Sequence, residues 1–143
     1  MSGVGFRANT AQVATGTSAK TILQIVAASN HRVVVNKIVV SFEGVTVTDA
    51  PIQVRVLRQS TAGTMSALTL VKDGDTAETL EVSAQHTASA EPTAGDVLEW
   101  QLVHPQSSRV FVGPYTIPGG GRLGVEVTAA VGVDCIVSAY GEE

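Results

Sequence analysis

Three histidines are the side chains of this sequence best suited to binding a metal ion. His31, His86 and His104 lie far apart in the chain, and no two of them stand at the short spacing typical of metal ligands. A metal-binding cupin would use two histidines one residue apart, a nearby carboxylate and a third histidine. The sequence therefore predicts no metal site and no cofactor.

The single cysteine is the strongest nucleophile that the sequence offers. Cys135 alternates with Val133 and Val137, which is the pattern of a strand with one buried face, and buried cysteines commonly act as small apolar side chains. No G-x-S-x-G elbow marks a catalytic serine, and no histidine lies near Cys135 in the sequence. We predict a structural cysteine and a protein that is not an enzyme.

Trp100 is the only tryptophan, and it alternates with Leu98 and Leu102. This pattern favours a tryptophan that anchors an apolar core. The alternative is an aromatic surface on which a sugar ring stacks, with Tyr115 as its second member.

The composition restricts the classes of partner. The chain has 143 residues, of which 15% are charged, and its net charge is −4 with nine basic residues scattered singly. Without a basic stripe to neutralise phosphates, nucleic acid is not an expected partner. No signal peptide is recognisable, and no apolar run approaches the roughly 18 residues of a membrane span. We expect synthesis in the cytoplasm and no membrane partner.

The elements that must position these side chains are short strands. Residues 32–58 contain two runs of alternating apolar residues, which we expect to be antiparallel neighbours, and residues 20–28 favour a strand over a helix. Further alternating runs follow, separated by turn signals. We predict an all-β, single-domain β-sandwich or jelly-roll-like barrel of about eight short antiparallel strands. The jelly roll is preferred over an immunoglobulin-like sandwich because the Cys-Trp-Cys arrangement is missing.

Residues 1–18 are predicted to be an extended N-terminal arm, and residues 19–143 the β-sandwich domain. The arm is rich in small residues and could order on a partner. In the first of the two runs in residues 32–58, the alternate residues that would face away from the core are also partly apolar. Such an outward apolar row favours a subunit contact. We therefore predict a homo-oligomer, a trimer by preference. The candidate interface residues are Val4, Phe6, Arg7, Val33, Val35 and Val39.

Four runs carry a resemblance to a known family. They are TGTSAKTILQIVAASNHRVVV (residues 15–35), VRVLRQSTAGTMSALT (54–69), QHTASAEPTAGDVLEW (85–100) and GGGRLGVEVTA (119–129). Together they resemble small structural proteins of tailed phages and prophages, which are single jelly-roll or related β-barrel domains that decorate or cement capsids, usually as trimers. The runs mark strands and turns, so the resemblance carries no catalytic residues.

The resemblance implies a virion protein that binds the major capsid protein on the outside of the shell and stabilises it. The alternative is a carbohydrate- or receptor-binding module of a head fibre or tail.

Overall fold

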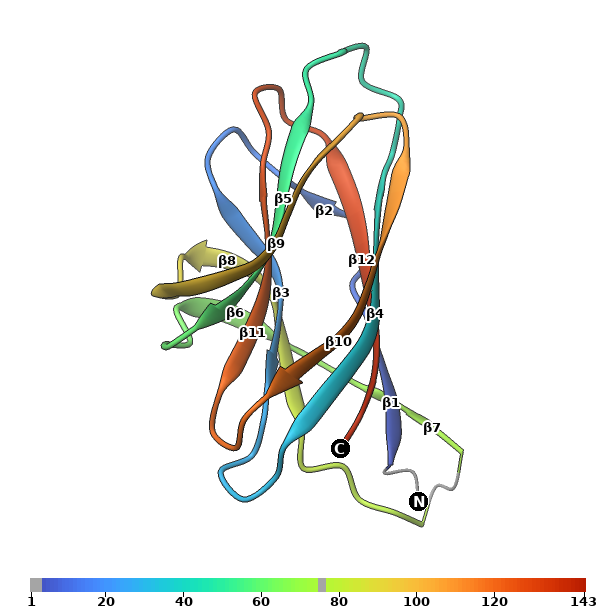
Figure 1. Ribbon diagram of the computed structural model, residues 1–143. Helices are drawn as coiled ribbons and strands as arrows, with labels where there is room; N and C mark the ends of the chain where they lie inside the picture. The colour runs from blue at the N-terminus through green and yellow to red at the C-terminus, as the bar shows by residue number, and fades with distance from the viewer. Residues whose placement is uncertain (1–3, 75–76) are drawn as a thin grey trace.

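The computed structural model describes residues 4–74 and 77–143 and shows a sandwich of two antiparallel β-sheets (Figure 1). Sheet A contains, in spatial order, β10 (Ser108–Ile117), β4 (Val33–Phe42), β12 (Asp134–Glu142), β1 (Gly5–Asn9) and β7 (Val71–Asp73), and β2 (Val13–Ala14) pairs with β12. Sheet B contains β6 (Thr64–Leu68), β8 (Ser83–Ala90), β3 (Lys20–Val26), β11 (Arg122–Thr128), β5 (Ile52–Gln59) and β9 (Ala94–Val103). The predicted β-sandwich is confirmed, with twelve strands in place of about eight. None of the described residues forms a helix that could cross a membrane.

Eight of the strands have the connectivity of a jelly roll. Taken along the chain as β1, β3, β4, β5, β9, β10, β11 and β12, the first pairs with the last, the second with the seventh, the third with the sixth and the fourth with the fifth. The resulting sheets have the orders β1-β12-β4-β10 and β3-β11-β5-β9. This order is that of one long hairpin rolled into two facing sheets, as in a jelly roll.

The remaining major strands form an insertion between β5 and β9. From β5 the chain leaves to build β6, β7 and β8 and then returns to β9. Strands β6 and β8 continue sheet B beyond β3, whereas β7 continues sheet A beyond β1, so the insertion reaches from one sheet to the other (Figure 1). The sequence of this polar region predicts short strands near residues 67–71 and 79–84, whereas the structure has three strands, at residues 64–68, 71–73 and 83–90.

Buried apolar side chains from the two sheets pack against each other to form the core. Each fully buried side chain of this size stabilises the fold by about 1.5–3 kcal/mol. The largest are Phe6, Ile22, Leu23, Ile25, Ile38, Ile52, Phe111 and Ile117.

An irregularity in β4 corrects the predicted pattern of buried residues in that strand. Tyr140 and Gly141 are consecutive in β12, yet they pair with Lys37 and Val35, so Asn36 is an extra residue in β4. Such a bulge changes the face on which the following side chains point. Val35 therefore lies on the same buried face as Ile38, and the predicted outward-facing apolar row at Val33 and Val35 is wrong.

Two further expectations are corrected by the sheet order. The runs of residues 32–58 become β4 and β5, which lie in opposite sheets and are not neighbours. The segment predicted to be an arm, residues 1–18, contributes β1 and β2 to sheet A, with β1 paired to both β12 and β7. Residues 1–3 of the predicted arm lie outside the described residues.

Candidate interaction surfaces

The structure divides the predicted interface residues between the core and the surface. Phe6, Val33 and Val35 are at most 1% exposed and pack between the sheets, so they are not available to a partner. Val39 and Arg7 lie on the outer face of sheet A, which no other element of the described chain pairs with or covers. Val4 is half-buried, and its amide and carbonyl pair with those of the C-terminal Glu143.

The outer face of sheet A carries a row of side chains centred on Tyr140. In register across β1, β12 and β4, Arg7 lies beside Tyr140 and Tyr140 beside Lys37. The Arg7 guanidinium is 5.0 Å from the Tyr140 ring centroid, and the Lys37 ammonium is 4.5 Å from it. Arg7 also forms an ion pair with Asp73 at 3.5 Å. The aromatic ring is thus held between two cations and kept in place on the surface.

Apolar side chains surround this row. Val112 pairs in register with Lys37, and Val110 pairs with Val39. Val112 is 72% exposed, and Val110 and Ile136 are also exposed. Single exposed valines are ordinary, but several on one uncovered sheet face form a surface suited to a protein partner. We call this surface, made of Val39, Val110, Val112, Ile136 and Tyr140, the sheet A face.

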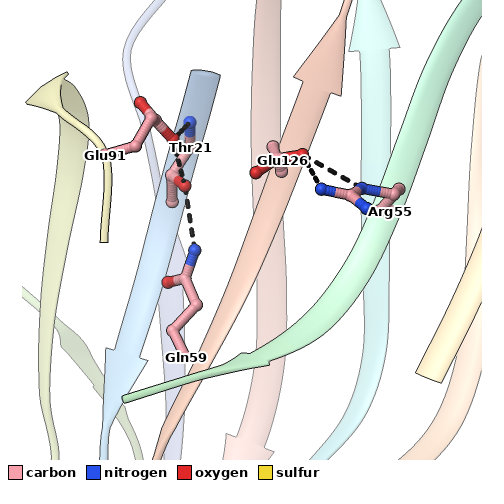
Figure 2. Close-up of polar contacts among 5 residues, drawn as sticks. All are labelled: Thr21, Arg55, Gln59, Glu91 and Glu126. Atoms are coloured by element: carbon pink, nitrogen blue, oxygen red, sulfur yellow. Dashed lines mark hydrogen bonds and ion pairs between the residues drawn. The ribbon is translucent and has the colours of Figure 1, made fainter. Parts of the chain in front are cut away.

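Trp100 lies on the surface and not in the core, which corrects the prediction for this residue. It is 57% exposed on β9, and the Arg55 guanidinium lies 5.5 Å from its ring centroid. Arg55 in turn donates to Glu126 through Nε at 3.0 Å and through a second nitrogen (Figure 2). Because Glu126 is buried, this ion pair holds Arg55 firmly behind the indole.

The sequence misplaced Trp100 because β9 is apolar on its outward side and polar on its inward side. Glu99 and Gln101 point toward the space between the sheets, where they are half-buried, and only Val103 reaches the core. At the edge of a sandwich this space opens to water, so inward positions accept polar side chains. In the sequence, Glu99 and Gln101 alternate with leucine and tryptophan. This alternation does not tell which of the two sets faces the core.

A buried polar group lies beside this edge. The Tyr115 side chain on β10 is 7% exposed, so it cannot form the second half of a sugar-stacking surface. Its hydroxyl forms no hydrogen bond of normal geometry among the described residues. Burial, followed by the negative charge of Glu99 and a loose hydrogen-bond contact with that carboxylate, raises the pKa of Tyr115 to about 12. Glu99 itself accepts one long hydrogen bond, from Gln101 Nε2 at 3.3 Å.

A network of polar side chains fixes the connections that enter and leave the insertion. Glu91 accepts hydrogen bonds from the Thr21 amide and hydroxyl, both at 2.8 Å, and Gln59 donates to the Thr21 hydroxyl at 2.9 Å (Figure 2). Gln24 donates to Gln59 Oε1 at 2.7 Å. Since these side chains bond to one another, the network is a structural clamp and leaves no group directed at a ligand.

The predicted chemistry-bearing residues are dispersed. His31 pairs with Glu81, His104 lies 3.4 Å from Asp49, and His86 contacts the neighbouring Thr87 hydroxyl. Among the described residues no three His, Cys, Asp or Glu side chains are placed to share a metal ion. Cys135 is buried, as predicted, and burial raises the pKa of its thiol to about 12.

The four sheet edges differ in how they are protected from pairing with another chain. Strand β7 has three residues and β6 has five, and very short edge strands offer little to pair with. Strand β10 is long but contains a register shift and Pro114, which has no amide hydrogen. Strand β9 is ten residues long without proline, and residues 99–103 pair regularly with β5. Among the edges of the described chain, β9 is therefore the one best able to accept a further strand.

Comparisons with protein-family models, with curated proteins and with solved structures found no match to this chain.

Proposed function

We propose that this protein is a non-enzymatic virion protein that binds the outside of a phage capsid as a decoration or cement protein. The observation that carries the proposal is the sheet A face, an uncovered surface on a compact jelly roll where Val110, Val112 and Ile136 are exposed around Tyr140. Exposed apolar side chains do not stabilise a monomer in water, whereas a protein shell that binds this surface buries them. The resemblance of the four sequence runs to phage structural proteins supports the same role.

The mechanism would be added contact area between neighbouring capsid subunits. A standard protein interface buries on the order of 1,600 Å², and many copies repeated over a shell give avidity without a strong single site. Arg7 and Lys37, which flank Tyr140, would add charge-assisted contacts to acidic groups of the major capsid protein. No cofactor, nucleic acid or membrane takes part in this mechanism.

The sequence-based prediction of a homotrimer stays a prediction, but its reasoning changes. It depended in part on Val33 and Val35, which are buried. Of the six predicted interface residues, Arg7 and Val39 remain on the surface that we assign to the capsid.

The test is to reconstitute particles with increasing amounts of protein and to measure their thermal disassembly. Because the protein binds only the assembled lattice, disassembly should move to higher temperature in proportion to occupancy. Val112→Asp should reduce occupancy, and Thr64→Asp, which changes an exposed residue of β6 in sheet B, should not. Full occupancy without any change in disassembly would reject the cement function.

A carbohydrate- or receptor-binding module of a head fibre or tail is the second candidate, and the exposure of Trp100 favours it. The indole is held in place by Arg55 and Glu126, as a stacking surface for a sugar requires. Glycan-array binding that is lost in Trp100→Ala but retained in Val112→Asp would support this candidate over capsid decoration.

A further inference from the structure

The exposed part of β9 has a sequence that is symmetric about Trp100. Leu98 and Leu102 lie two residues on either side of it, and Glu99 and Gln101 lie one residue on either side. In an antiparallel strand pair centred on Trp100, Leu98 would lie opposite Leu102 and Glu99 opposite Gln101. We propose that β9 pairs with β9 of a second copy of this chain about a twofold axis through Trp100, which joins the two B sheets edge to edge.

The side chains select this register over its neighbours. With a twofold axis perpendicular to the sheet, outward residues lie opposite outward residues. The axis must therefore pass through a residue, and the neighbouring registers are centred on Glu99 and on Gln101. A pair centred on Glu99 would place two carboxylates directly opposite each other, which is destabilising. A pair centred on Gln101 would place Glu99 opposite the apolar Val103. Centring on Trp100 gives apolar pairs outside and carboxylate-amide pairs inside.

The strand is free to make this contact. Residues 99–103 of β9 pair regularly with β5 on one side, and no strand of the described chain lies on the other side. Leu98, Trp100 and Leu102 are all exposed, with Leu102 at 62%. In the pair these side chains would lie beside their counterparts on one continuous sheet face, and each interface residue would meet its counterpart as an isologous contact requires.

The polar groups at this edge supply an independent reason for a partner strand. The buried Tyr115 hydroxyl forms no hydrogen bond of normal geometry among the described residues and has only a loose contact with the Glu99 carboxylate, which also accepts the long bond from Gln101. A buried polar group without a good hydrogen bond destabilises the free monomer. In the proposed register Gln101 of the second copy lies opposite Glu99, and its side-chain amide is a donor that the Glu99 carboxylate can accept from.

The first test is the oligomeric state of the purified protein, measured by sedimentation velocity over a concentration series. We expect a monomer-dimer equilibrium. Gln101→Lys should tighten the dimer, because each Glu99 would face a cation, and Gln101→Glu should weaken it; the two variants should differ from wild type in opposite directions by about 2-fold to 30-fold in Kd. Thr116→Lys and Thr116→Glu give the same charge changes on exposed β10 and should leave Kd unchanged.

The second test fixes the register by disulfide formation. In the proposed pair Leu98 faces Leu102, so a mixture of Leu98→Cys and Leu102→Cys proteins should cross-link on mild oxidation, and neither variant alone should do so to the same extent. Cys135 is buried and does not compete. The dimer is a rival to the homotrimer that the sequence predicts. A monomer at all concentrations, that trimer, or equal cross-linking of a single variant would overturn the proposal. None of these outcomes involves capsids, so the proposed virion function is tested separately.

Discussion

Gly124 on β11 leaves the space that the hydrogen-bonded network of Thr21, Gln24 and Gln59 occupies. A Cβ atom at this position would lie less than 3.0 Å from three atoms of the Gln59 amide, which bonds to Gln24 and Thr21. We predict that Gly124→Ala lowers the free energy of unfolding by about 2 kcal/mol, since it separates buried hydrogen-bonded groups. Urea unfolding followed by Trp100 fluorescence gives the measurement.

Gly132→Ala is the matched control for this substitution, because its Cβ would meet only ordinary contacts of 3.7 Å or more. The cost of Gly124→Ala should shrink in a Gln59→Ala background, where the clashing amide is gone. An equal cost in both backgrounds would show that backbone effects, and not the clamp, explain the loss.

Cys135 and Tyr115 together predict a loss of stability in alkali. Burial raises the pKa of Cys135 from its ordinary value of 9.0 to about 12, and burial with Glu99 raises that of Tyr115 from 10.0 to about 12. Between these values the unfolded chain has lost protons that the folded chain keeps, so the free energy of unfolding falls as pH rises. Cys135 alone contributes a slope of about 1.4 kcal/mol per pH unit in that window.

Unfolding midpoints in urea at pH 8 and pH 10.5 measure this effect. Cys135→Ala should flatten the pH dependence while leaving the contribution of Tyr115. An identical slope in the variant would mean that the thiol does not stay protonated in the folded protein.

Strand β1 has a structural role that its small-residue sequence conceals. Phe6 is fully buried in the core, whereas Arg7 next to it points outward from sheet A. We predict that Phe6→Ala costs about 3–5 kcal/mol of stability and that Arg7→Ala costs about 1 kcal/mol or less. Thermal or urea unfolding of the two variants checks the difference.

Deletion of residues 1–14 should accordingly destabilise the whole domain. If the truncated protein instead unfolds at the wild-type midpoint, β1 behaves as the detachable arm that the sequence indicated.

The sequence predicted strands better than it predicted their neighbours. Alternation identified β4 and β5, whereas β3 was identified by its short length and its strand-favouring residues. The glycine-rich run at residues 119–121 forms a turn in which Gly120 has a φ of 79°. Alternation contains no information about which sheet a strand joins, because both sheets bury one face. The bulge in β4 had a local sign, since Asn36 and Lys37 are two consecutive polar residues within an apolar run.

The exposed surfaces were predictable only in part, because local alternation does not tell where a strand lies in its sheet. Arg7 was placed correctly on the surface, but Trp100 was not, since β9 alternates in both orientations and only its position at a sheet edge decides which side faces water. That position follows from the pairing of β9 with β5 across the insertion, a long-range feature that no local pattern records.

At the scale of the whole molecule, the insertion adds strands to one side of the sandwich only. The long strands β9 and β10 stay at the edges of the other side. Strands β6, β7 and β8 extend the sheets beyond β3 and β1, while β9 and β10 remain as edges. The molecule therefore has one side built up by extra strands and one side with a free strand edge. The sheet A face and the β9 edge share no residue, so the proposed dimer and the proposed capsid contact do not compete for the same side chains.

The sparse charge of the molecule predicts how its capsid binding responds to salt. Only 15% of the residues are charged, and the sheet A face presents valine and isoleucine around Tyr140. Screening weakens contacts between exposed charges but leaves apolar burial intact, so occupancy of reconstituted particles should be retained from low salt to about 1 M salt, where the Debye length is about 3 Å. Quantifying the protein that co-sediments with particles across this range is the measurement. Release of the protein in high salt would assign the contact to Arg7 and Lys37 instead, and Lys37→Ala should then weaken binding at low salt more than Val112→Asp does.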